Sequence, residues 1–203
     1  MTATRIIIFA KAPVPGFAKT RLIPALGAER SAELAGQMLF NTLHEALAAD
    51  IGPVELCVTP EINDAAWQGI QLPEGIEIFA QGEGDLGERL ARASERVLGN
   101  AGAVLLIGTD CVELSGALLR EAAQTLHEYA AIIHCTTDGG YALLGIKRFD
   151  PLLFSDMPWS TDAVAVTTIA RIRQLGCPVR IGQTLHDVDE PEDLKYVAAK
   201  LWL

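Results

Sequence analysis

The sequence has few cysteines, and none of them lies in a metal-binding or redox motif. Cys57, Cys111, Cys135 and Cys177 are widely spaced and form no C-x-x-C pair. Neither a zinc ribbon nor a thioredoxin-like site is therefore expected. Buried free thiols are the favoured interpretation.

Long hydrophobic runs are also missing. No segment approaches the unbroken apolar length that crosses a bilayer, so no membrane span is predicted. The short N-terminal run, residues 6–10, leads into Lys11 rather than a small-residue cleavage site, which does not fit a signal peptide. A cytoplasmic location is the resulting expectation.

Positive charge is scarce as well. The formal net charge is −10 and the pI is about 4.8. This balance argues against nucleic-acid or anionic-membrane partners, because both would repel it. Half of the 203 residues are hydrophobic, and this length favours one domain over residues 1–203. The oligomeric state stays open, with a homodimer as one arrangement.

Apolar strand-like runs alternate with amphipathic helical segments along the whole chain, without repeats or linkers. This alternation predicts a doubly wound α/β fold. The turn signal at 138–140 joins two runs that can pair antiparallel, so a mostly parallel mixed sheet is expected. The expected strands are 5–10, 54–59, 76–80, 103–107, 130–134, 141–146 and 179–181; the expected helices are 28–49, 85–98, 115–129, one capped by 160–162 and ending near 175, and one from 191 to the chain end.

The loop after the first strand concentrates positive charge in an acidic chain. Three of the sixteen Lys and Arg residues, Lys11, Lys19 and Arg21, fall within eleven positions, and Gly16 lies among them. A phosphate-bearing ligand is the first candidate for this loop. Lys19-Thr20 resembles the end of a P-loop, but proline and alanine stand at its glycine positions, which excludes that motif.

A second glycine pattern, residues 82–87, matches G-x-G-x-x-G after a strand and before a helix. Glu83 and Asp85 would oppose a pyrophosphate there, so a loop bordering a ligand cleft is favoured over a dinucleotide site.

Carboxylates that could hold a divalent cation follow two of the expected strands. Asp110 ends an apolar strand, where ligands gather in open α/β sheets, although it could merely cap the next helix. Asp187 and Asp189 lie on one side of the backbone if that stretch is extended. For Asp189 the alternative is an N-cap before Pro191, so Asp187 ranks higher as a second ligand for Mg²⁺ or Mn²⁺.

The turn at Asp138 and a later tryptophan are candidates for the second substrate. Asp138 is either a turn residue or a base facing the acceptor. Gly139, Gly140 and Tyr141 follow it directly. Trp159 could stack on a sugar or base, or simply anchor its loop.

Several motifs together resemble the bacterial nucleotide-diphospho-sugar transferase-like proteins of GT-A fold. They run in order over nearly the full length: FAKAP at 9–13, PG at 15–16, KTRL at 19–22, GDLGER at 84–89, GTDC at 108–111, DGGY at 138–141, PWST at 158–161, DVD at 187–189 and PEDL at 191–194. The resemblance implies a GT-A-like, Rossmann-like three-layer α/β/α sandwich. It also implies a nucleotide over the first loop and a divalent metal on Asp110, with a carboxylate of the 187–189 segment.

Three activities remain open at this point. The leading one is a metal-dependent glycosyltransferase that takes a nucleotide-sugar donor and an unidentified small-molecule acceptor, with Asp110 and Asp138 as catalytic residues. Similarity to phospholactate guanylyltransferases and sugar-nucleotide synthetases supports a nucleotidyltransferase that uses a nucleoside triphosphate. An inactive nucleotide-binding module is the third, because Val112 replaces the usual proline and removes a D-x-D motif.

Overall fold

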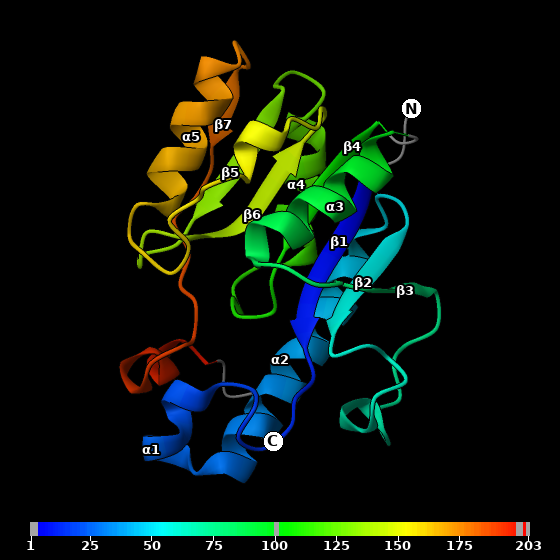
Figure 1. Cartoon of the computed structure of the whole chain (residues 1–203), viewed down its shortest axis with the longest axis vertical. Helices are drawn as coiled ribbons and strands as arrows, with labels where there is room; N and C mark the ends of the chain where they lie inside the picture. Colours follow the sequence, from blue (N-terminus) through cyan, green and yellow to red (C-terminus); the bar gives the residue numbers. More distant parts are fainter. Residues whose placement is uncertain (1–3, 100–101, 198–200, 202–203) are drawn as a thin grey trace.

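A seven-stranded sheet in the order β3-β2-β1-β4-β6-β5-β7 organises the computed structural model, which describes residues 4–99, 102–197 and 201 (Figure 1). Strand β6 runs antiparallel to β4 and β5, and the other neighbouring pairs are parallel. The strands are β1 (Thr4–Lys11), β2 (Val54–Thr59), β3 (Ile76–Ala80), β4 (Ala103–Ile107), β5 (Ala131–Cys135), β6 (Tyr141–Ile146) and β7 (Val179–Ile181).

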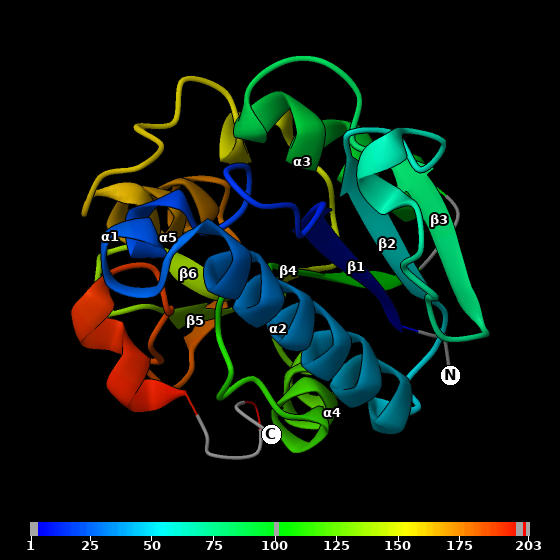
Figure 2. The ribbon, with the colours of Figure 1, turned by 90° about the horizontal axis from the view of Figure 1, so that it is seen from below.

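Helices cover both faces of this sheet. In Figure 2, α2 and α4 lie on one side of the strands and α3 on the other. The α-helices are α1 (Ile23–Leu26), α2 (Ala28–Ala49), α3 (Leu86–Leu98), α4 (Gly116–Thr125) and α5 (Val164–Gln174); the 3₁₀ turns are η1 (Thr20–Leu22), η2 (Ala65–Trp67), η3 (Pro151–Leu153) and η4 (Pro191–Tyr196).

The apolar central strands explain the three layers. Ile6, Ile7 and Ile8 of β1 are all fully buried. Ile6 and Ile8 pack in the cluster that includes α2 and α4, whereas Ile7 packs with α3 and α5. Because side chains alternate across a strand, an unbroken apolar run needs a helical layer on each side. The predicted α/β architecture with a mostly parallel mixed sheet is confirmed.

Some predicted boundaries are wrong at helix ends. The helix expected over 115–129 ends at Thr125, because the amides of His127 and Glu128 bond three residues back and tighten the turn. The helix expected after 160–162 begins at Val164, where Ala163 is the N-cap and makes no side-chain cap bond. The strand expected at 130–134 is shifted by one residue.

The C-terminal helix is also shorter than expected. Its described part is the 3₁₀ turn Pro191–Tyr196, and most of the predicted remainder, including Trp202, lies outside the described residues.

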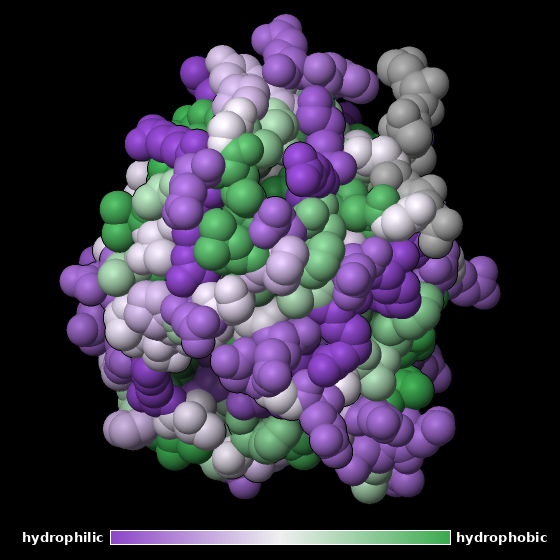
Figure 3. Space-filling view, turned by 45° about the horizontal axis from the view of Figure 1, so that its top comes forward, coloured by the Kyte–Doolittle hydropathy of each residue, from purple (hydrophilic) through white to green (hydrophobic). Residues whose placement is uncertain are grey.

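All four cysteines are free, as expected, but only Cys57 and Cys111 are buried, while Cys135 and Cys177 are half-buried. Among the described residues, no helix is long and apolar enough to cross a membrane. On the face in Figure 3, hydrophilic and hydrophobic residues are interspersed rather than gathered in one apolar area.

The strand order places a crevice beyond β1 and β4. From β1 the chain moves outward to β2 and β3, then crosses to β4 on the opposite side of β1. Strands β1 and β4 are parallel neighbours, so their carboxyl ends meet at one edge. Such a reversal of strand order opens a ligand crevice in α/β sheets.

Candidate active site

A cavity of about 710 Å³ opens at this edge of the sheet. It collects most of the residues singled out from the sequence. Its lining includes Lys11, Lys19, Arg21, Asp110, Asp138, Gly140, Tyr141, Trp159, Asp187 and Asp189. Two predicted site residues, Gly16 and Gly139, are not among the residues that line it.

Lys19 lies at the centre of the charged end of the cavity. Its ammonium group donates hydrogen bonds to Asp110 Oδ1 and, at 2.9 Å, to Asp189 Oδ1. The side chain is only 7% exposed. Burial alone would lower the pKa of Lys19, but the two carboxylates more than offset it and raise the pKa above its ordinary value. Lys19 is therefore a fixed cation between two predicted metal ligands.

Asp187 adds a third carboxyl group near the ammonium of Lys19. It is held beside Asp110 because Val188 N donates to Asp110 O at 2.9 Å, and Val188 itself is fully buried. Burial, followed by the charges of Asp110, Asp189 and Asp138, raises the pKa of Asp187 to about 8. Negative charge thus exceeds the single ammonium of Lys19.

The carboxylates suit a hard divalent cation in chemistry. Asp110, Asp187 and Asp189 offer only oxygen donors, which Mg²⁺ and Mn²⁺ prefer. Within the described residues, however, no three His, Cys, Asp or Glu side chains converge as a preformed metal cage. The Lys19 ammonium lies between two of these carboxylates instead. The three carboxyl groups fit a divalent cation that would neutralise them together with the Lys19 ammonium or in its place.

The capping alternatives for two of these carboxylates are excluded. Ser115, not Asp110, caps α4 through the amide of Leu118 at 3.4 Å. At η4 the N-cap is Glu190, whereas Asp193 accepts hydrogen bonds from the amides of Asp189 and Glu190. The side chains of Asp110 and Asp189 are free of a capping role and turn to Lys19.

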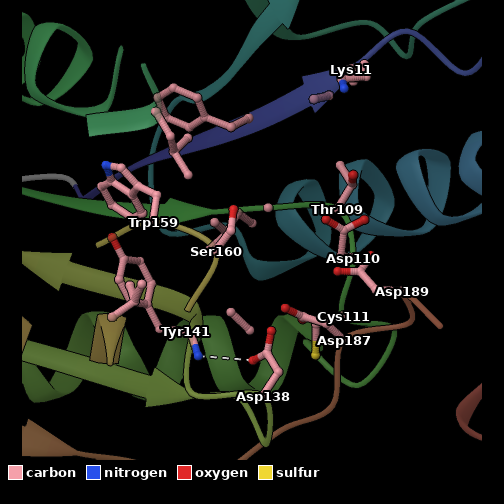
Figure 4. Close-up of a pocket in the computed structure, with 18 of the residues that line it drawn as sticks. Lys11, Thr109, Asp110, Cys111, Asp138, Tyr141, Trp159, Ser160, Asp187 and Asp189 are labelled. Carbon is pink, nitrogen blue, oxygen red and sulfur yellow. Dashed lines mark hydrogen bonds between the residues drawn. The ribbon is translucent and has the colours of Figure 1, made fainter. Parts of the chain in front are cut away.

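Asp138 is a turn residue, one of the two roles predicted for it, and it also lines the cavity. Its Oδ1 accepts hydrogen bonds from Gly140 N at 3.0 Å and from the Thr136 hydroxyl, as in an Asx turn. Figure 4 draws the hydrogen bond from Gly140 N and shows the second carboxylate oxygen of Asp138 pointing into the cavity. The turn therefore fixes one oxygen and leaves the other available to a ligand.

Gly139 packs closely against the backbone of Asp162. Its φ is +90°, and a Cβ at this position would lie 2.3 Å from the Cα of Asp162. Its carbonyl accepts a hydrogen bond from Ala165 N at 2.8 Å. The Asp138 turn is thereby pressed against the loop that carries Trp159 and Ser160. Ser160 itself has a φ of +62°, an uncommon conformation for a residue other than glycine.

The other two cations of the first loop lie at the rim. Lys11 Nζ stands 4.9 Å from the ring centre of Phe17. Arg21 Nη1 is 3.4 Å from Glu190 Oε1, and its side chain is 63% exposed. The three cations predicted to bind one diphosphate are therefore separated, with Lys19 buried inside the cavity and Lys11 and Arg21 at its rim.

Sequence reasoning missed Gln81 and Arg89. The buried amide of Gln81 donates to Ala10 O at 3.1 Å and to Cys57 O at 2.9 Å, which ties β1, β2 and the end of β3 together. Arg89 Nη1 donates to Gln81 Oε1 at 3.1 Å, and both side chains line the cavity. The signal for Gln81 was its position directly after a strand, and the signal for Arg89 was its place at the end of the GDLGER motif.

The two ends of the cavity differ in character. Figure 4 shows Asp110, Asp187 and Asp189 together at one end, and Trp159 and Tyr141 together at the other. Asp138 and Ser160 lie between them. The cavity can thus hold the charged part of a ligand at the carboxylate end and a less polar part at the other end, with Asp138 between them as a potential base.

Solved structures share this fold. A protein from Desulfovibrio desulfuricans G20 described as a putative nucleotide-diphospho-sugar transferase matches with a TM-score of 0.87 at 29% identity, over 98% of this chain and 88% of that chain. CMP:2-keto-3-deoxy-manno-octonic acid synthetase complexed with CTP matches with a TM-score of 0.60 at 13% identity, over 96% of each chain. A manganese complex of a protein from Mycobacterium tuberculosis H37Rv matches with a TM-score of 0.52 at 16% identity, over 96% of this chain and 97% of that chain.

These likenesses confirm the GT-A-like fold that the sequence motifs implied. Among curated proteins, none matches the sequence. A family model described as "Uncharacterized protein conserved in bacteria (DUF2064)" matches residues 42–161, more than half of the chain. The chain belongs to this family.

Proposed function

We propose that the protein is a metal-dependent glycosyltransferase that uses a nucleotide-sugar donor. The observation that carries this proposal is the excess of carboxylates around Lys19 at the carboxyl ends of β1 and β4, beneath a rim of cations. Nucleotide diphosphates bind as complexes with divalent cations, so a site for them needs both kinds of charge. The 29% identical transferase-like structure supports the same assignment.

Asp110, Asp187 and Asp189 would hold Mg²⁺ or Mn²⁺, and the manganese complex of a protein of similar fold supports this choice. When bound, the metal neutralises negative charge on the leaving diphosphate. Lys11 and Arg21 lie at the rim, where they can bind phosphate oxygens. The Lys19 ammonium holds Asp110 and Asp189 in place for the donor.

Asp138 is the proposed general base. Its free oxygen accepts the proton of the acceptor hydroxyl, and the hydroxyl oxygen forms a bond with the anomeric carbon of the donor. The bond between that carbon and the diphosphate breaks, and the nucleoside diphosphate leaves with the electron pair. Gly140 and Thr136 keep the carboxylate oriented through their hydrogen bonds to its other oxygen. Tyr141 and Trp159 border the acceptor.

Nucleotidyl transfer is the second candidate. The likeness to the synthetase solved with CTP favours it, since that protein has the same fold and a nucleoside triphosphate bound. In this reaction an acceptor oxygen would attack the α-phosphorus and release pyrophosphate. The third candidate, an inactive nucleotide-binding module, rests on Val112, which packs in the cluster around Leu22 and Val188.

A thermal-shift panel separates these functions. UDP-, GDP-, CDP- and TDP-sugars are compared with nucleoside triphosphates, each with and without Mn²⁺ or Mg²⁺. A ligand at a hundredfold over its Kd adds about 2.7 kcal/mol of stability, which is readily detected. A shift with sugar nucleotides alone supports glycosyl transfer, and pyrophosphate release from a triphosphate and acceptor supports nucleotidyl transfer. If no nucleotide shifts the midpoint with either metal, the proposal fails.

A further inference from the structure

The Lys19 ammonium lies where a cation shared by two carboxylates has to lie. Its Nζ donates hydrogen bonds to Asp110 Oδ1 and, at 2.9 Å, to Asp189 Oδ1. Figure 4 shows these two carboxylates close together at one end of the cavity. A metal ion bound to both oxygens would have to take the same place, because the two atoms converge on the ammonium. Lys19 therefore stands in the position of the cation that the site is proposed to bind.

The first loop delivers Lys19, and not its neighbour, to this position. Lys19 has a φ of 48° and a ψ of 43°, a left-handed conformation that is uncommon for a residue with a side chain. Its side chain is only 7% exposed, whereas that of Arg21, two residues later in the same loop, is 63% exposed. Strained backbone of this kind is often found at functional sites. The placement of the ammonium is thus built into the loop.

Charge explains why neither a metal nor a diphosphate suits this cavity alone. A divalent cation that entered beside Lys19 would meet a buried like charge. A diphosphate that entered without a metal would face Asp110, Asp187 and Asp189. When both enter, the carboxylates can pair with the metal and the ammonium can pair with a phosphate oxygen. Every charge then keeps an opposite partner.

We propose that Lys19 couples the binding of metal to the binding of nucleotide. Without ligands its ammonium blocks Asp110 and Asp189, and it turns from them to a phosphate oxygen when a divalent cation and a diphosphate enter together. The flexible four-carbon stem of lysine allows this turn. The inference rests on the proposed function and specifies the regulation of the same site, which takes the metal–diphosphate complex in preference to either part.

A lysine that only braced the carboxylates would behave in the opposite way. Its removal would let Asp110 and Asp189 move apart, and the affinity for a metal would fall. Removal of a lysine that blocks the carboxylates raises that affinity instead. The direction of the change in metal affinity therefore separates the two roles of Lys19.

Binding of Mn²⁺ without nucleotide tests the blocking role. The electron paramagnetic resonance signal of free Mn²⁺ is followed in titrations of the wild type, Lys19→Met and Lys11→Met. We expect Lys19→Met to bind Mn²⁺ at least about tenfold more tightly than the wild type, because one buried like charge is gone. Lys11 lines the same cavity, but its Nζ stands 4.9 Å from the ring centre of Phe17, so Lys11→Met should change this affinity by no more than about twofold.

The ammonium signal of Lys19 in ¹H–¹⁵N NMR spectra tests the turn in the wild type, where no variant has to fold. It is assigned by its loss in Lys19→Met, or by its shift in Asp189→Asn if that variant does not fold. We expect Mg²⁺ alone to leave the signal in place, and Mg²⁺ with UDP or GDP to move it. Binding of both nucleotides is measured by calorimetry under the same conditions.

The outcomes keep this inference apart from the proposed function. The inference is overturned if Lys19→Met binds Mn²⁺ no more tightly than the wild type. It is also overturned if Mg²⁺ alone moves the ammonium signal as far as Mg²⁺ with nucleotide does, or if a nucleotide binds and leaves the signal unmoved. Failure of all nucleotides to bind the wild type with either metal refutes the proposed function, and the Mn²⁺ titrations still decide whether Lys19 blocks the carboxylates.

Discussion

Replacing Lys19 by methionine should expose the charge imbalance of the site. The ammonium joins Asp110 and Asp189, and its loss leaves these two charged carboxylates beside Asp187 without the cation that bridges them. Breaking a buried ion pair costs about 3–5 kcal/mol. The Asp110 and Asp189 side chains are 45% and 39% exposed, so solvent screens part of this loss. We therefore expect Lys19→Met to lower the free energy of unfolding by about 1–3 kcal/mol.

A divalent cation should reverse this effect. It supplies the positive charge that the variant lacks, so Mn²⁺ should raise the midpoint of Lys19→Met by more than it raises that of the wild type. Urea unfolding and thermal shift with and without Mn²⁺ measure both quantities. Lys147→Met removes an exposed lysine outside the cavity and is the control. Equal stabilisation of wild type and Lys19→Met by Mn²⁺ would refute the idea that this ammonium and the metal share the same carboxylates.

Three further predictions concern single residues. Without metal, the pKa of Asp187 is 3.8 in the unfolded chain and about 8 in the folded protein. Because the folded state holds this proton more tightly, the wild type loses stability as the pH rises from 3.8 to about 8. Asp187→Asn should therefore gain stability over the wild type between these values and none below them, and an equal difference at pH 4 and pH 8 in thermal unfolding would count against this. Gly139→Ala should lower stability by about 1–3 kcal/mol, because the positive φ and the contact with Asp162 both disfavour a Cβ; a normal midpoint would contradict the geometry. Glu55 is fully buried and paired with Arg96, so Glu55→Gln should cost about 1–3 kcal/mol in urea unfolding, and no loss would show that the pair contributes nothing.

The sheet could be predicted because its strands are strongly patterned. The buried run in β4 and the breaks that follow it fixed both its limits and the position of Asp110. The helix after it was predicted too long, because sequence periodicity does not show where the backbone tightens into a 3₁₀ turn.

The members of the site were easier to predict than their contacts. The carboxylates and cations follow strands that end at one edge, so their gathering was expected. That Lys19 turns inward to Asp110 and Asp189, while Arg21 stays at the rim, depends on the left-handed backbone at Lys19, with φ of +48°, which no local pattern indicates. The role of Gln81 depends equally on contacts with distant strands.

Calorimetric titration of Asp110→Asn with a nucleotide-sugar tests the central claim most directly. Asn keeps the shape of the side chain but removes the negative charge that a metal ligand needs. We expect wild-type protein to bind the nucleotide-sugar only with Mn²⁺ or Mg²⁺, and Asp110→Asn to lose this binding while its circular dichroism stays unchanged. Metal-dependent nucleotide binding that persists in Asp110→Asn would contradict the assignment of Asp110 to the site.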